Sequence, residues 1–231
     1  MKIALFHALQ EFRGRPCPVA LVTELISGRQ SLVTADEWLG DLVLPEEMLA
    51  GVRRMLAGDE SGSLDGLFVR VYGLPWVMVA IGAVHITQAL APMAALAGFR
   101  VTVIEPRRAF ARPERFTGVT LVNDWPDEAL QRIPLTARTA VVSLTHDPKI
   151  DDVGLIAALR SPAFFIGALG STRTHAKRKA RLREAGFGDN ELARIAAPVG
   201  LDLGGRLPGE IAAAISAELV GARHGRRRER P

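Results

Sequence analysis

The sequence predicts an α/β protein in which a doubly wound parallel sheet follows a small α+β domain. From Trp76 onward, apolar segments of strand length alternate with segments of helical periodicity, the pattern of a parallel sheet with helices on both faces. Before that point the chain carries a hairpin signature and lacks this alternation. We therefore expect an N-terminal domain over residues 1–73, a Rossmann-like domain over 74–222 and a basic, disordered tail over 223–231.

The N-terminal domain is expected to combine helices with a short antiparallel sheet. Residues 1–12 predict a helix with loose apolar periodicity. PVALVTEL (18–25) and SLVT (31–34) predict two strands of a hairpin, joined by the turn residues SGRQ. PEEMLAGVRRMLAG (45–58) predicts a helix that begins with proline and two acids, and SLDGLFVRVYG (63–73) predicts a single strand.

The second domain is expected to contain five strands in the order 3-2-1-4-5. The strands are predicted from Trp76 to Gly82, over RVTVIE (100–105), TLVN (120–123) and TAVVSLT (139–145), and within PAFFIGALGS (162–171), ending at Gly167. The helices are predicted over residues 86–97, 124–133, 151–161, 171–188, 189–195 and 207–222. Asp151 and Ser171 are the expected N-caps of two of them.

Composition predicts a cytoplasmic protein without a nucleic-acid or membrane partner. The chain of 231 residues is 48% hydrophobic, and no apolar segment reaches the length of a membrane span. Its first residues lack the features of a signal peptide. The net charge of +4 resides in the tail, where residues 223–231 hold five arginines and one glutamate, so the rest of the chain is neutral. The single Cys17 excludes an internal disulfide, and the Cys and His spacing gives no metal site.

The turn GAVHIT (82–87) matches the dinucleotide fingerprint Gly-x-Gly-x-x-Gly/Ala only in part. Gly82, Val84 and Thr87 occupy the three fingerprint positions. Glu105 follows Gly82 by 23 residues, close to the spacing at which an acid accepts hydrogen bonds from a ribose. Two interpretations stay open here: an NAD(P)-dependent oxidoreductase with a degenerate fingerprint, or a turn that binds nothing.

Three loops are expected to meet beyond the carboxyl ends of the first, fourth and fifth strands. They read GAVH (82–85), THDP (145–148) and GALGSTRTH (167–175). The third favours an anion, because it combines glycines and hydroxyls with the start of a helix rich in cations, although a solvated basic face over 177–183 is the alternative. His146 with Asp147 could serve in acid–base chemistry or bind a polar heterocycle, whereas a structural role is the alternative for His146 and His85.

Four separated segments resemble the XdhC/CoxI family of accessory proteins for molybdenum hydroxylases such as xanthine dehydrogenase. They are GAVHITQALAPMAALAGFRVTVIEPRRAFARPERF, LTHDPKIDD, AFFIGALGSTRTHAKRKARLREAGF and APVGLDLGGRLPGEIAAAISAEL, and they cover about two thirds of the chain. The resemblance implies a maturation factor, rather than a catalyst, that binds the molybdenum cofactor (molybdopterin) and hands it to a molybdenum hydroxylase apoenzyme. It also implies support for cofactor sulfuration with a sulfurtransferase, and a homodimer formed through the N-terminal domain. The expected cofactor-binding residues are Gly82, Val84, His85, Glu105, Thr145, His146, Asp147, Gly167, Gly170, Ser171, Thr174 and His175, with no catalytic or metal-binding residue expected.

The chain departs from the family pattern in two places. Val84 stands where family members usually have glycine, so its side chain should either push an anion away or shift it toward the GALGS loop. The cysteine-containing segment usual in the N-terminal domain of the family has no match between Ser31 and Gly62. A ligand-free paralogue that acts only through protein contacts is therefore a third interpretation, beside the cofactor chaperone and the NAD(P)-dependent enzyme.

Overall fold

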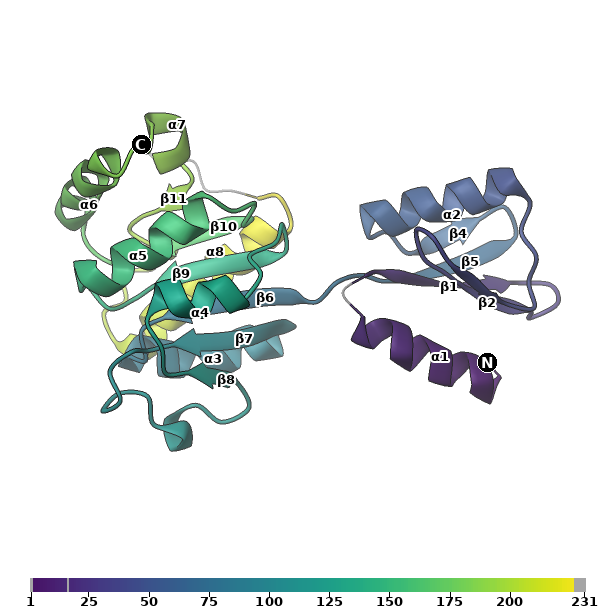
Figure 1. Cartoon of the computed structure of the whole chain (residues 1–231), viewed down its shortest axis with the longest axis horizontal. Helices are drawn as coiled ribbons and strands as arrows, with labels where there is room; N and C mark the ends of the chain where they lie inside the picture. Colours follow the sequence, from purple (N-terminus) through teal and green to yellow (C-terminus); the bar gives the residue numbers. More distant parts are fainter. Residues whose placement is uncertain (1, 16, 227–231) are drawn as a thin grey trace. The chain divides into compact units, whose positions relative to one another are not determined.

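The chain divides into two compact units at Leu74 and Pro75. A computed structural model describes residues 2–15 and 17–226 (Figure 1). Residues 227–231 of the predicted tail lie outside the described residues. Arg223, the first residue of that predicted tail, is the last residue of a helix, and its guanidinium donates to the carbonyl of Ala97 at 3.1 Å.

The N-terminal unit is an antiparallel sheet with one helix on each face (Figure 1). Helix α2 packs its apolar side on strand residues such as Val22 and Val69, whereas α1 packs on the opposite side over Val19 and Leu32. The strands are ordered β3-β2-β1-β5-β4. The described elements of this unit are α1 (Ile3–Gly14), β1 (Val19–Glu24), β2 (Gln30–Val33), β3 (Trp38–Gly40), α2 (Glu46–Gly58), β4 (Gly62–Leu64) and β5 (Leu67–Tyr72).

The segment predicted as one strand over 63–73 forms a hairpin instead. β4 pairs with β5, and the two turn residues Asp65 and Gly66 both have positive φ angles of 43° and 81°. Such a turn matches the twist of paired strands, and Asp-Gly is a favoured sequence for it. The single-strand prediction was wrong because the alternation of Leu67, Val69 and Val71 was extended across this turn.

The second unit is a six-stranded parallel sheet in the order β11-β10-β9-β6-β7-β8. Numbered along the chain, this is 3-2-1-4-5 with a sixth strand at the edge, so the predicted fold class and strand order are confirmed. The described elements are β6 (Trp76–Ile81), α3 (His85–Leu96), β7 (Phe99–Ile104), the 3-10 turn η1 (Pro113–Arg115), β8 (Thr120–Val122), α4 (Pro126–Arg132), β9 (Thr139–Ser143), α5 (Pro148–Leu159), β10 (Phe165–Ala168), α6 (Thr172–Glu184), α7 (Asp189–Leu192), β11 (Ile195–Ala196) and α8 (Pro208–Arg223).

Apolar side chains cover both faces of this sheet, as a parallel sheet requires. Helices α3 and α8 pack on one face through residues such as Leu90 and Ile215. Helix α5 and the end of α6 pack on the other, through Leu155 and Leu182. Every residue of β9 is buried. No helix among the described residues is long and apolar enough to cross a membrane.

Three local predictions in this unit were wrong. The helix predicted over 189–195 ends at Leu192, and Ile195–Ala196 form the sixth strand, which was not predicted. Helix α5 begins at Pro148, and its N-cap is Asp147, whose side chain accepts from the Lys149 N–H at 3.0 Å, so Asp151 lies inside the helix and does not cap it. Strand β10 continues through Ala168. Gly167 is therefore buried within the strand, where a Cβ atom would lie 2.6 Å from a methyl group of Val199, and it does not line a loop.

Candidate functional site

Strands β6 and β9 define the switch point of the parallel sheet. They are neighbours, and the helices that follow them, α3 and α5, pack on opposite faces. In sheets of this kind, ligands bind beyond the carboxyl ends of the strands at such a point. The loops there are in contact: the N–H of Leu144 donates to Ile81 at 2.9 Å, and that of Leu169 donates to Ser143 at 2.9 Å. The sheet thus brings the three predicted loops side by side.

The first turn is held by contacts within the protein. Gly82 has a φ of +104°, and a Cβ atom there would lie 2.3 Å from the methyl of Thr145, so only glycine suits this position. The buried hydroxyl of Thr87 donates to the carbonyl of Gly82, which explains how threonine replaces the third glycine of the fingerprint. Val84 precedes α3 in an extended conformation, and its half-buried side chain packs against the core.

Glu105 anchors this turn and has no free acceptor position for a ribose. Its buried carboxylate accepts from the Ala83 N–H at 2.9 Å, from the Arg107 N–H at 3.0 Å, and from two guanidinium nitrogens of Arg107 at 2.7 and 2.8 Å. These four bonds use the roughly four lone-pair sites of a carboxylate. The expectation that Glu105 accepts from a ribose is therefore corrected. Burial alone would raise the pKa of Glu105, but the bonds from Arg107 and Ala83 outweigh it and leave the pKa below its ordinary value.

The second loop is tied to a buried acid on α5. The hydroxyl of Thr145 donates to Asp151 at 2.6 Å and accepts from the Asp147 N–H at 3.0 Å. Asp151 is 2% exposed. His146, between these residues, is exposed and has a φ of +66°. The adjacent residues His146 and Asp147 thus play different parts, since the carboxylate of Asp147 caps α5 and His146 is exposed.

Asp151 faces a buried arginine on α6. Arg178 is 2% exposed; its Nη2 lies 3.9 Å from Oδ2 of Asp151 and donates to the carbonyl of Leu169 at 2.9 Å. Within residues 2–15 and 17–226, Nε and Nη1 of Arg178 and Oδ2 of Asp151 have no hydrogen-bond partner. Burial lowers the pKa of Arg178, and the nearby Asp151 opposes that shift.

A cavity of about 260 Å³ lies beside this pair. Its wall carries one carboxylate and four cationic side chains, of which Arg181 is paired with Asp152. The lining residues are His146, Pro148, Asp151, Arg173, Thr174, Lys177, Arg178 and Arg181. The cavity therefore joins the second predicted loop to the first turns of α6 and has an excess of positive charge.

The remaining predicted site residues lie around these loops. Ser171 caps α6 as predicted, because its side chain accepts from the Thr174 N–H at 3.2 Å. Gly170 has a φ of +127° and a Cβ there would lie 3.0 Å from Thr174. His85 is exposed in the first turn of α3, and His175 is half-buried on α6. No group of three or more possible metal-ligating side chains is found among the described residues.

Sequence reasoning missed Arg178 and Asp151 as a buried pair. The alternative prediction for residues 177–183 was a solvated face, and neither prediction placed Arg178 in the interior. Arg178 is spaced four residues from Leu182, the buried apolar residue of α6. That spacing places the two on one side of a helix and was the available signal. Asp151 was interpreted as a cap because it precedes an apolar segment.

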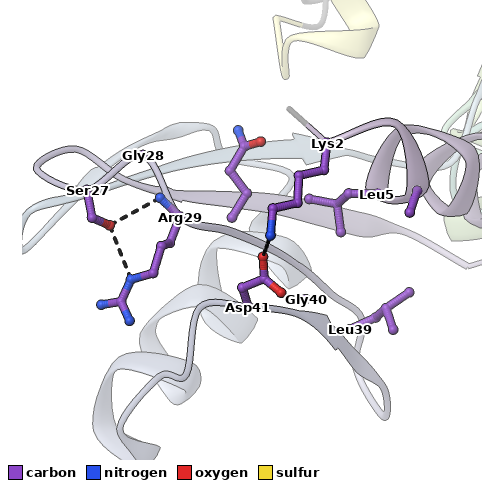
Figure 2. A pocket seen from close by; sticks show the side chains of 10 residues that line it. Lys2, Leu5, Ser27, Gly28, Arg29, Leu39, Gly40 and Asp41 are labelled. Carbon is purple, nitrogen blue, oxygen red and sulfur yellow. Dashed lines mark hydrogen bonds and ion pairs between the residues drawn. The ribbon is translucent and has the colours of Figure 1, made fainter.

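A larger cavity of about 940 Å³ lies in the N-terminal unit, beside α1 and the edge of the sheet near β3 (Figure 2). Its polar groups pair with one another at the surface: Lys2 with Asp41, and Arg29 with Ser27 (Figure 2). The Lys2 and Asp41 side chains are largely exposed. Among its described lining residues, this cavity holds neither a buried charge nor a buried polar side-chain atom without a partner, so it is a weaker candidate than the smaller cavity.

Residues 78–219 match the family model described as the XdhC Rossmann domain. The chain belongs to the XdhC family. The structure of a protein described as a xanthine dehydrogenase from Bacillus halodurans superposes with a TM-score of 0.78 over 98% of this chain and 67% of that one. At 20% identity, this likeness shows a shared fold.

Curated proteins also match this XdhC chain. The uncharacterised protein YqeB of Escherichia coli K12 is 31% identical over 71% of this chain. The molybdenum cofactor insertion chaperone PaoD of the same organism is 39% identical over 37% of this chain. A Bacillus subtilis 168 protein described as a probable xanthine dehydrogenase component is 29% identical over 63%. The chain spans 30%, 27% and 42% of the length of these three relatives, respectively.

Proposed function

We propose that this XdhC protein is a maturation factor that binds the molybdenum cofactor and delivers it to a molybdenum hydroxylase of the xanthine dehydrogenase type. Family membership supports this role, as does the likeness to a relative named as a molybdenum cofactor insertion chaperone. The main structural support for this function is that three loops lie side by side at the switch point of the sheet, next to a cationic cavity. A sulfurtransferase and a second copy of the chain are further partners that we propose from the family resemblance.

The residues fit such a cofactor at two of the three loops. A pyranopterin carries a phosphate and many hydrogen-bonding edges. His146, Thr174 and Arg178 line the cavity and supply donors and positive charge for these groups. The first turn fits an anion poorly, because the Ala83 N–H is bonded to Glu105 and the Val84 side chain covers the adjacent core. The cofactor supplies redox chemistry to the enzyme that receives it, and the residues of this chain bind and orient it.

The NAD(P)-dependent interpretation has less support. An acid that accepts from a ribose needs free lone pairs, and those of Glu105 are taken by Ala83 and Arg107. The paralogue that binds no ligand differs from the proposed chaperone in one measurable property, the presence of pterin on the purified protein.

Purification from a host that makes the cofactor tests the proposal. Pterin released from the protein by oxidation should exceed that from an unrelated protein of similar size and charge purified in parallel. Addition of the loaded protein to a molybdenum hydroxylase apoenzyme should then restore its activity. Pterin at background level would overturn the proposal in favour of the ligand-free paralogue, and saturable binding of NAD(H) or NADP(H) would favour the oxidoreductase.

A further inference from the structure

The buried guanidinium of Arg178 is only partly satisfied by the protein. It has five N–H donors. Nη2 donates to Leu169, whereas Nε and Nη1 find no partner among the described residues. Burying a cation whose N–H donors have no acceptor costs free energy, and buried polar groups are almost always hydrogen-bonded. We therefore expect a bound group to accept from these donors.

Asp151 does not complete the coordination of Arg178. The closest distance between the two side chains, from Nη2 to Oδ2, is 3.9 Å, which is an ion pair and too long for a hydrogen bond. The other carboxylate oxygen, Oδ1, is used by the N–H and hydroxyl of Thr145. Asp151 thus balances one positive charge and leaves the donors of Arg178 free for another group.

The surroundings favour an anion in the cavity. Arg173 and Lys177 also line it and lie in the first two turns of α6. The amino end of this 13-residue helix carries the positive end of its dipole. Thr174 adds a hydroxyl to the wall. Cationic side chains, the positive end of the α6 dipole and the unused N–H donors of Arg178 are therefore found at one cavity.

We propose that this cavity binds the phosphate group of a phosphate monoester, with Arg178 as its buried ligand. A planar guanidinium with several free N–H groups matches the oxygens of a phosphate. The cavity, at about 260 Å³, is smaller than the roughly 300–1,000 Å³ of most pockets for whole ligands, so it receives one end of a larger molecule. This deepens the proposed function by naming the group that anchors the cofactor, and it rests on that function only for the identity of the molecule that carries the phosphate.

Titration of the full chain with inorganic phosphate, measured by isothermal calorimetry, tests the anchor. The control is a titration with potassium chloride at equal ionic strength. We expect saturable binding in the millimolar range or tighter. Arg178→Gln should weaken it by at least about tenfold, since hydrogen bonds to charged groups are the stronger class. Lys179→Gln removes a neighbouring cation of α6 that does not line the cavity, and it should change the affinity by less than about twofold. Absence of saturable binding, or equal affinity in Arg178→Gln, would overturn the proposal.

A second measurement covers the case in which Arg178→Gln fails to fold. In the unmodified protein, the Nε–H resonance of Arg178 should shift on addition of phosphate and not on addition of chloride; an unmoved resonance would contradict the proposal.

The phosphate anchor and the proposed cofactor role can be refuted independently of each other. Phosphate binding without co-purified pterin leaves the anchor intact and removes the cofactor role, whereas pterin retained at the wild-type level by Arg178→Gln removes the anchor alone.

Discussion

Glu105 shows how one side chain fixes the turn on which a dinucleotide site would depend. Its carboxylate bridges the Ala83 N–H of the first turn and both the backbone and guanidinium of Arg107. Glu105→Gln would replace two acceptor positions by donors that face Ala83 and Arg107. We expect a loss of about 2–3 kcal/mol in the free energy of unfolding, measured by urea denaturation, because buried donors would lose their partners. The exposed Glu184→Gln should change it by less than about 0.5 kcal/mol.

Glu105 also makes the free energy of unfolding depend on pH in a definite direction. The pKa of Glu105 in the folded protein lies below its ordinary value of 4.5. A lowered pKa stabilises the folded state above the ordinary pKa, and this contribution is lost as pH falls through the lowered one. The difference in unfolding free energy between wild type and Glu105→Gln should thus be largest near neutral pH and shrink below pH 4.5. A difference independent of pH would contradict this assignment.

Ser171 contributes to helix stability and not to the proposed anchor. Its hydroxyl accepts from the Thr174 N–H, and it does not line the cavity. Ser171→Ala should cost about 1 kcal/mol in the free energy of unfolding through the lost cap, and Ser171→Asp should restore most of it. Phosphate affinity should stay within about twofold of wild type in Ser171→Ala, since a lost capping bond leaves Arg178 in place. If Ser171→Ala lost phosphate affinity together with stability, and Ser171→Asp restored both together, the cap and the anchor would not be separable.

For single residues, the sequence predicted those roles that depend on neighbours along the chain. Ser171 was predicted as a cap because hydroxyl residues precede helices for a local reason. Arg178 was not predicted as buried, because its environment comes from α5 and from the loop after β10, which are distant in sequence. Glu105 was placed at the correct strand end, but its lone pairs are occupied by Arg107, a pairing that spacing alone does not reveal.

The turn between β6 and α3 carries Val84 at the second position of the dinucleotide fingerprint, where glycine would allow close approach of an anion. Val84 occupies the N-cap of α3 and packs partly on the core. We expect Val84→Gly to leave pterin and phosphate binding unchanged, because the anchor lies at α6. It should lower the free energy of unfolding by about 1 kcal/mol, since part of an apolar side chain is removed from the core. Pterin binding that appears only in Val84→Gly would assign the cofactor to this turn and make the wild-type chain the ligand-free paralogue.

Elements with a long pattern were predicted, whereas two very short strands, β3 and β11, were missed. The alternation of strands and helices after Trp76 predicted a doubly wound parallel sheet, and 3-2-1-4-5 is a common strand order for such a sheet. Strands β3 and β11 contain three and two residues, too few to show a period of two. The hairpin of β4 and β5 did carry a signal, the dipeptide Asp65-Gly66 with positive φ at both positions.

For the whole molecule, the two units have separate hydrophobic cores. The clusters of the N-terminal unit contain only residues up to Tyr72, and those of the sheet with parallel strands begin at Trp76. A unit with its own core can fold alone. We therefore expect a fragment of residues 75–231 to unfold cooperatively in urea and to bind phosphate within about twofold of the full chain, because every lining residue of its cavity is included. The same fragment with Arg178→Gln is the matched control and should lose this binding. A fragment that is unfolded, or folded but unable to bind phosphate, would show that the N-terminal unit contributes to the core or to the anchor.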